Sequence, residues 1–528
     1  GIDNTYEYKA PAALEGTKKL TGREMAAGEF TFTARLYKTN IGSEGERSYA
    51  TAEIIYNDEN DTTGRANPDY VTEVHSTPTK LTAKNVAAED NGANTPVSTS
   101  AITFPTVYYV DAGTYYFSVG NAHEAVDNVL AAQGASTEGD AENVQTWDLD
   151  AMDTTTFAQT KNGTNVENQL QDMDVNYWLP GTATYLSRSD WAGTFPATIS
   201  GLTASADMLA IMGNDNYQMQ NTGSDVVFGA ENGMTLAAMK GVTDLGDERW
   251  GLLMDQINLE DCMIRTGFGG TSTKAIESIM SPEAIQNDGP NGIYSYPLGQ
   301  YANTDKSSGD PCAIDASDPN AGYQAGVMGN ETVIAQTFNK DLAEEYGEVM
   351  GNFSLWSNLT IWWGIGVNVH RSPYNARNHE YYSEDPVLSS FLGAKTIEGA
   401  QKYGVIAAPK HIAFNDSEVN RTGVATFMTE QKARECELRA MQASIEDAKA
   451  LGAMTAYNRV GVYTDNAHPT LLKNIVRGEW GFQGLMSEDF IMDPSYVALK
   501  EAVLNGVTMS CNTGESTMAA VSGYYWYW

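Results

Sequence analysis

The feature that most constrains this fold is an alternation of short apolar runs with helical patterns between about residues 200 and 515. The runs have the length and composition of buried strands, and segments between them such as KDLAEEYGEVMGN place apolar residues at helical spacing. The runs expected as strands are IWWGIGVNVH (361–370), YGVIAAPKH (403–411), GAMTAYN (452–458), FQGLMSED (482–489) and GVTMSCN (506–512). This alternation predicts an α/β fold, a (β/α)8 TIM-type barrel.

Composition divides the 528 residues into three regions, as expected for a chain longer than one hydrophobic core allows. Residues 1–125 hold β-branched and aromatic runs such as EFTFTARLY and GTYYFSV between turn-forming residues, and predict an all-β sandwich. Residues 126–200 are acidic and rich in Thr, Asn and Gly, which predicts a linker or cover segment. Residues 201–528 hold the barrel, so the chain is expected to be multidomain.

Charge and hydropathy argue against several classes of partner. The chain has 32 Lys and Arg against 68 Asp and Glu, a net charge of −36, so nucleic acid and anionic membranes are not expected partners. No apolar run is long enough to span a membrane. The N-terminal GIDNTYEYKA lacks signal-peptide features, so the chain is either cytosolic or has lost its signal.

Cofactors are also not expected. The four cysteines are far apart, only six histidines occur, and the spacing of a metal site is missing. The sequence contains no phosphate-binding loop, dinucleotide fingerprint or HExxH motif. We therefore predict no metal and no organic cofactor.

Polar side chains follow the apolar run of each predicted strand. In a barrel the carboxyl ends of the strands carry the chemistry, so these side chains are expected to meet. They are Asp288 in NDGPNG, then Arg377, His379 and Glu380, then Lys410, His411 and Arg421, then Met454 and Tyr457, and finally Glu488 and Asp489. Carboxylates, cations, an imidazole and a phenol suit the hydroxyl groups of a sugar.

Plainer interpretations of five positions stay open at this point. Asp489 could cap a helix, and Asp288, which precedes Gly-Pro, could form a turn. Lys410 and His411 could be a satisfied core pair, and Tyr457 could be barrel packing.

Three long motifs carry a resemblance to a known family: RSPYNARNHEYYSEDP, KHIAFNDSEVNR and LLKNIVRGEWGFQGLMSEDF. Together with TYLSRSDWAGTFP (184–196) they make residues of about 200–515 similar to the catalytic barrel of glycoside hydrolase family 3, the β-glucosidase and β-xylosidase family. The resemblance implies that Asp489 is the catalytic nucleophile. It implies substrate binding by Asp288, Arg377, Lys410, His411, Met454 and Tyr457, with Arg421 and Glu380 in support.

A second resemblance concerns the N-terminal region. LEGTKKLTGREMAAGEFTFTARLY and SAITFPTVYYVDAGTYYFSV are similar to pilin-type isopeptide-linkage domains of bacterial surface proteins, which are crosslinked from Lys to Asn. Lys18 or Lys19 lies on the matching first strand, but the acid expected after GTYYFSV is replaced by Gly120 and Asn121.

The sequence thus predicts a retaining glycoside hydrolase that cleaves terminal β-linked glucose or xylose from oligosaccharides through a covalent glycosyl-enzyme on Asp489. The family's acid/base glutamate comes from a separate domain that is not recognisable here, so a homo-oligomer or a partner chain is a candidate source. The enzyme is expected to be bacterial and extracellular or at the cell surface. The alternative is a surface or filament protein whose impaired barrel serves a structural or carbohydrate-binding role.

Overall fold

The computed structural model describes residues 36–38, 48–50, 110, 112–183, 201–213, 226–262, 272–293, 326–490 and 496–511. The chain divides into two compact units. The first consists of residues 1–158 and 184–198, and the second of residues 159–183 and 199–528. The predicted boundaries at residues 125 and 200 stay a prediction.

The described residues of the first unit form two antiparallel strand pairs. They are β1 (Leu36–Lys38) with β2 (Ser48–Ala50), and β3 (Gly113–Ser118) with β4 (Val144–Leu149). Between β3 and β4 lie the helix α1 (Ala122–Ala132), which Asn121 caps by accepting from the Glu124 N–H, and the turn η2 (Ala141–Asn143). Most of the predicted sandwich, including Lys18 and Lys19, lies outside the described residues. A strand at 113–119 was expected and β3 covers 113–118, but its partner β4 lies inside the segment interpreted as an acidic linker.

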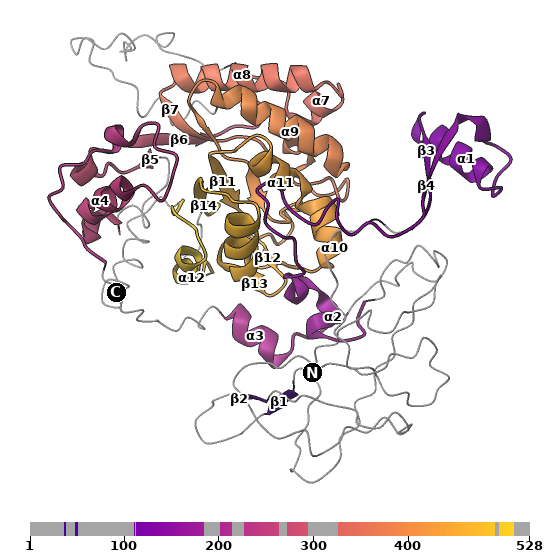
Figure 1. The fold of residues 1–528 in the computed structure, drawn as a ribbon, viewed down its shortest axis with the longest axis horizontal. Coiled ribbons are helices and arrows are strands. Elements are labelled where there is room, and N and C mark those ends of the chain that lie inside the picture. Colours follow the sequence, from indigo (N-terminus) through magenta and orange to yellow (C-terminus); the bar gives the residue numbers. More distant parts are fainter. Residues whose placement is uncertain are drawn as a thin grey trace. The chain divides into compact units, whose positions relative to one another are not determined.

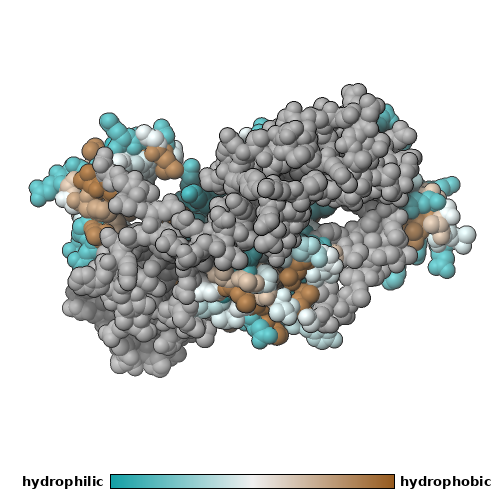
Figure 2. All heavy atoms as spheres, turned by 90° about the horizontal axis from the view of Figure 1, so that it is seen from below, coloured by the Kyte–Doolittle hydropathy of each residue, from teal (hydrophilic) through white to brown (hydrophobic). Residues whose placement is uncertain are grey.

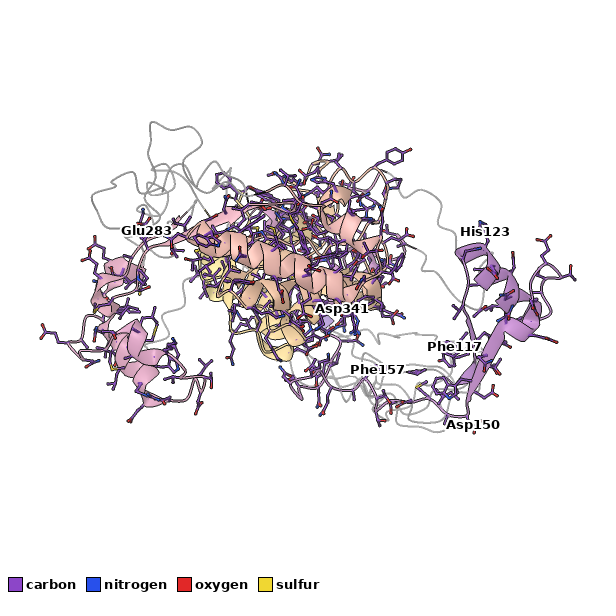
Figure 3. All side chains as sticks on the ribbon, turned by 90° about the horizontal axis from the view of Figure 1, so that it is seen from above. Phe117, His123, Asp150, Phe157, Glu283 and Asp341 are labelled. Atoms are coloured by element: carbon purple, nitrogen blue, oxygen red, sulfur yellow. The ribbon has the colours of Figure 1, made fainter. Side chains whose placement is uncertain are left out.

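This strand pair leaves large apolar side chains in solvent. Phe117 and Phe157, labelled in Figure 3, are 55% and 52% exposed. Trp147 is 48% exposed and pairs with the ring of Tyr115 at a centroid distance of 5.3 Å. On the face drawn in Figure 2, brown apolar side chains are interleaved with teal and white ones.

Parallel strands form the centre of the second unit. The first group runs β6 (Ala284–Asp288), β7 (Leu359–Trp363), β8 (Ile406–Ala407), and the second runs β9 (Lys410–Ile412), β11 (Gly452–Thr455), β14 (Leu485–Ser487). A parallel bridge between Gly366 and Lys410 joins the two groups, and another between Ser487 and Met509 continues beyond β14. Four of the predicted runs therefore hold parallel strands in chain order, although each strand is shorter than its run. The fifth run, 506–512, contributes only the bridge at Met509 within the described residues.

Helices connect the parallel strands (Figure 1). They are α7 (Glu331–Ala335), α8 (Lys340–Trp356), α9 (Pro386–Gln401), α10 (Glu430–Lys432), η9 (Ala433–Glu437), α11 (Arg439–Glu446), η10 (Asp465–Ala467), η11 (Thr470–Glu479) and α12 (Leu499–Leu504). Helices α8 and α9 pack closely because of two glycines. A Cβ on Gly347 would lie 2.0 Å from the Thr396 carbonyl oxygen, and one on Gly399 would lie 2.1 Å from that of Glu344. Among the described residues, no helix combines the length and apolar character needed to cross a membrane.

The remaining described elements are short. They are η3 (Gln171–Met173), α2 (Val175–Trp178), α3 (Ala206–Met212), η5 (Leu236–Met239), α4 (Glu248–Gln256), β5 (Ser272–Thr273), η6 (Glu277–Ile279), η8 (Asn378–Glu380), β10 (Ala425–Thr426), β12 (Arg459–Val460) and β13 (Tyr463–Thr464). The turn η8 positions part of the candidate site, because it follows the loop after β7.

Residues 159–183 belong to the barrel unit and form a segment that we call the strap. The Glu430 carboxylate accepts hydrogen bonds from the backbone N–H groups of Gln169 and Leu170, at 2.9 and 2.7 Å. Thr160 Oγ1 donates to the Glu479 carbonyl at 2.9 Å. Leu170 and Met173 are fully buried in the main core. The strap thus completes the core of the barrel unit.

Buried His468, at the start of η11, provides a test of this packing. Burial lowers the pKa of His468 to about 3, whereas an unfolded histidine has a pKa near ~6.5. Between these values the unfolded chain binds a proton that the folded chain does not, so unfolding free energy falls as the pH falls. From pH ~7.5 to ~5 this single group should lower the stability by about 2 kcal/mol. Urea unfolding of the wild type and His468→Gln at both values measures it. The variant should show the smaller loss at acid pH, and equal losses would contradict the prediction.

Candidate active site

Asp489 lies two residues beyond the carboxyl end of β14. Its Oδ1 accepts a hydrogen bond from the Phe490 N–H at 2.7 Å, and its Oδ2 lies 3.4 Å from His411 Nε2. Burial favours the neutral carboxyl, but the positive charges of Arg377 and Lys410 oppose it, and the pKa of Asp489 is below its ordinary value. Asp489 is therefore an ionised carboxylate whose side chain is only 14% exposed.

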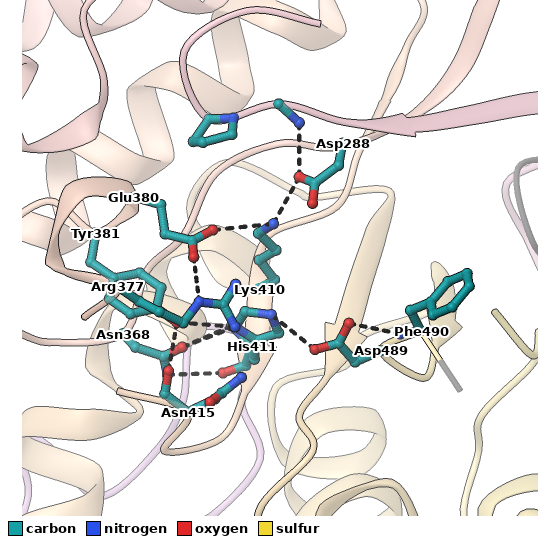
Figure 4. A network of polar contacts seen from close by, with 12 residues as sticks. Asp288, Asn368, Arg377, Glu380, Tyr381, Lys410, His411, Asn415, Asp489 and Phe490 are labelled. Atoms are coloured by element: carbon teal, nitrogen blue, oxygen red, sulfur yellow. Dashed lines mark hydrogen bonds and ion pairs between the residues drawn. The ribbon is translucent and has the colours of Figure 1, made fainter. Parts of the chain in front are cut away.

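Lys410, on β9, joins two of the other predicted carboxylates. Its Nζ lies 2.8 Å from Asp288 Oδ1 at the end of β6 and 3.3 Å from Glu380 Oε2 in η8 (Figure 4). Burial opposes the charge on Lys410, yet the two carboxylates raise its pKa above the ordinary value. Asp288 is 45% exposed, so one carboxylate of this cluster is open to a ligand.

Arg377 links this cluster to a neighbouring loop. Its Nε donates to Glu380, and its Nη1 lies 3.2 Å from Glu418 Oε1. Glu380 is buried, which raises its pKa, but Lys410 and Arg377 lower it further, to a net value below the ordinary one. Glu380 is therefore held between two cations and supports them.

His411 lies between the cluster and Asp489 (Figure 4). Burial and the charge of Arg377 lower the pKa of His411 to about 4, so the ring is neutral at pH 7. The structure thus brings together six of the residues predicted from the sequence: Asp288, Arg377, Glu380, Lys410, His411 and Asp489.

The other predicted site residues lie at the edge of this network. The Arg421 guanidinium lies over the Tyr457 ring at 4.6 Å and forms an ion pair with Glu418 at 3.3 Å. Burial and Asp489 raise the pKa of Tyr457, so the phenol stays neutral. Met454 packs in an apolar cluster with residues such as Trp363 and makes no part of the polar network.

Glu488, next to Asp489 in sequence, has a different environment. It is 3% exposed, and burial, only partly offset by contacts with Ser510, Cys511 and Asn466, raises its pKa to about 8. Glu488 is thus a protonated acid at neutral pH. Its side chain contacts different neighbours from that of Asp489, because successive side chains of an extended chain point in opposite directions.

Asn368, Tyr381 and Asn415 also belong to the network but were not predicted as site residues. Only a weak indication of these residues was present in the sequence. Asn368 is the one polar residue within GIGVNV after β7, and Tyr381 lies inside the RSPYNARNHEYYSEDP motif.

No group of three or more potential metal ligands occurs in the parts of the chain that the structure describes. The groups that meet here are carboxylates, two cations and a neutral imidazole. A buried ionised carboxylate can attack an electrophilic carbon, and the paired cations and carboxylates can hold several hydroxyl groups at fixed positions. These groups lie at the carboxyl ends of parallel strands, where α/β barrels place their active sites. A carboxylate nucleophile is one of the two carboxyl groups that retaining glycoside hydrolases use.

Part of the chain is also similar in sequence to known glycoside hydrolases. Residues 313–514 match the family described as the glycosyl hydrolase family 3 N-terminal domain. Beta-glucosidase A of Butyrivibrio fibrisolvens is 33% identical over 204 residues, which cover 38% of this chain and 24% of that protein. A beta-glucosidase of Ruminococcus albus is 31% identical over 259 residues, covering 47% of this chain and 25% of that protein. The chain therefore spans about a quarter of the length of these curated relatives.

A solved structure supports the fold. The crystal structure of a beta-glucosidase from Paenibacillus barengoltzii has a TM-score of 0.50 at 20% identity, covering 79% of this chain and 43% of that one. At this identity the likeness concerns the fold alone, and it agrees with the parallel α/β architecture around the site.

Proposed function

We propose that this chain is the catalytic barrel of a retaining β-glucosidase. It would release terminal β-linked glucose, or xylose, from oligosaccharides through a glycosyl-enzyme intermediate on Asp489. The observation that carries the proposal is the position of an ionised, nearly buried Asp489 beside the Lys410–Asp288–Glu380 cluster. We also propose that eight strands close the barrel around this site, as the sequence predicts.

The substrate-binding roles follow from the exposed and charged groups. Asp288 accepts hydrogen bonds from sugar hydroxyls, since it is half-exposed and oriented by Lys410. Lys410, Arg377 and His411 contact the same sugar, and Tyr457 and Met454 form its walls. Arg421 and Glu380 support these residues through ion pairs.

The acid/base group is the missing part of this mechanism. Retaining enzymes need a second carboxyl group roughly 5 Å from the nucleophile. Glu380 is held by two cations, and Glu418 is paired with Arg377 and Arg421. Glu488 contacts other neighbours, so we assign the acid/base role to none of these three. We propose that it comes from another part of the enzyme or from a partner chain, and that the enzyme acts outside the cell.

The test uses a substrate that needs no acid. The protein is incubated with a 2-deoxy-2-fluoro-β-glucoside bearing dinitrophenolate, which leaves unassisted, and peptides are then analysed by mass spectrometry. We expect one fluoroglucosyl group on the peptide containing Asp489. Glu488→Gln is the matched control and should be labelled like the wild type, because Glu488 is already neutral at pH 7. An unlabelled wild-type protein that still binds glucose would favour a carbohydrate-binding barrel instead.

A further inference from the structure

The ring of His411 has acceptors on both sides. Its Nδ1 lies 3.3 Å from the Tyr381 hydroxyl and 3.4 Å from Asn368 Oδ1, while Nε2 lies 3.4 Å from Asp489 Oδ2. A neutral imidazole carries one hydrogen, which can satisfy only one side. Its position decides whether Nε2 donates a hydrogen bond or accepts one.

The orientation of Asn368 is fixed by the backbone. Asn368 Oδ1 accepts from the His411 N–H at 3.0 Å, and Asn368 Nδ2 donates to the His411 carbonyl at 3.1 Å. Exchanging the amide oxygen and nitrogen would break both contacts. The atom facing Nδ1 is therefore the amide oxygen, which can only accept.

The Tyr381 hydroxyl is fixed in a similar way. It donates its hydrogen to the Asn415 carbonyl at 2.5 Å, so its oxygen has lone pairs left for Nδ1. The phenol is fully buried, and its ring stands at 90° to the imidazole with a centroid distance of 6.4 Å. Both atoms close to Nδ1 are thus acceptors.

We propose that Asn368 and Tyr381 are positioning residues that hold the single ring hydrogen of His411 on Nδ1, so that Nε2 accepts a hydrogen bond from a sugar hydroxyl. The sugar part of this inference rests on the proposed function. A pKa of about 4 keeps the ring from gaining a second hydrogen near neutral pH.

This arrangement has a consequence for the nucleophile. A hydrogen on Nε2 would bond to Asp489 Oδ2 and withdraw charge from it. With Nε2 bare, Oδ2 makes no hydrogen bond within the described residues and keeps its electron density. Nε2 and Oδ2 are then two acceptors 3.4 Å apart that lack a donor. A substrate hydroxyl that donates to them is stabilised more than it would be in water.

The test is the nitrogen spectrum of histidine in protein labelled with ¹⁵N in the imidazole ring. Six histidines give few signals, and His411→Gln identifies that of His411. We expect a protonated Nδ1 and a bare Nε2 at pH 7. A hydrogen on Nε2, or on both nitrogens, would overturn the proposal. The spectrum needs no turnover, so its outcome is independent of whether glycosidase activity is found.

Two phenylalanine variants separate positioning from packing. Tyr381→Phe removes one acceptor and should shift the signal of His411 toward the Nε2–H form, with kcat on an aryl glucoside lower by about five- to tenfold. Tyr382→Phe is the matched control, because the buried Tyr382 hydroxyl donates to Thr396 at 2.8 Å, away from the site. It should leave the His411 signal unchanged. An unchanged signal in Tyr381→Phe, or equal shifts in both variants, would refute the role of Tyr381.

Discussion

Replacing Asp489 with alanine is expected to lower kcat on an activated aryl β-glucoside by on the order of 10⁴-fold or more. The reason is that the ionised carboxylate 3.4 Å from His411 would be lost, and with it the covalent intermediate. Binding should persist, because Asp288, Lys410 and Arg377 keep their ion pairs. The measurement is steady-state release of the aryl group.

Restoring the activity of Asp489→Ala with a small anion would tie the loss of activity to the missing carboxylate. Azide can enter the space left by the carboxylate, attracted by the charges of Arg377 and Lys410, and attack the sugar directly. The product should be the α-glucosyl azide, since a single displacement inverts the configuration. Glu488→Gln, which exchanges one neutral group for another, should keep activity within a few-fold of the wild type. Full activity in Asp489→Ala would place the nucleophile elsewhere.

Replacing Arg434 with leucine is expected to have the largest effect on stability. Arg434 forms ion pairs with Glu430 at 2.8 Å and with Glu479, and all three side chains are almost fully buried. Without the guanidinium, two buried carboxylates would lose their cation, which costs about 3–5 kcal/mol. Urea unfolding should show this as a lower midpoint.

A surface variant provides the comparison. Lys402 forms ion pairs with Glu344 and Glu348 at 2.6 Å, but its side chain is 48% exposed. Lys402→Met should cost less than about 1 kcal/mol, because water screens exposed pairs. A loss in Arg434→Leu no larger than that in Lys402→Met would show that the buried network contributes little.

The sequence predicted which residues lie together better than it predicted the contacts between them. Asp489 and Lys410 could be placed because each follows an apolar run, and strand ends converge in a parallel barrel. The Lys410–Asp288 ion pair joins residues 122 positions apart and depends on strand register, which no local pattern encodes. Met454 has the position expected of it on β11, but its side chain packs with apolar neighbours.

Strands without a strong apolar pattern were the ones missed. Strand β6 reads AIQND, with Ile285 as its single large apolar residue, and its range was not predicted although Asp288 was expected at a strand end. Strand β4 reads VQTWDL inside an acidic stretch and is mostly exposed, so charge suggested a linker there. In both cases the strand is stabilised by its pairing with a neighbouring strand rather than by its own periodicity.

The strap imposes an order on the folding of this protein during its synthesis. Gln169 meets Glu479 310 residues further along the chain. At about 5–20 residues per second, ribosomes need roughly 15–60 s to cover that interval. During this time the side chains of Leu170 and Met173, which end fully buried, have no completed core to enter. A translating cell must therefore keep this early segment unpaired and protected until nearly the last barrel strand has emerged.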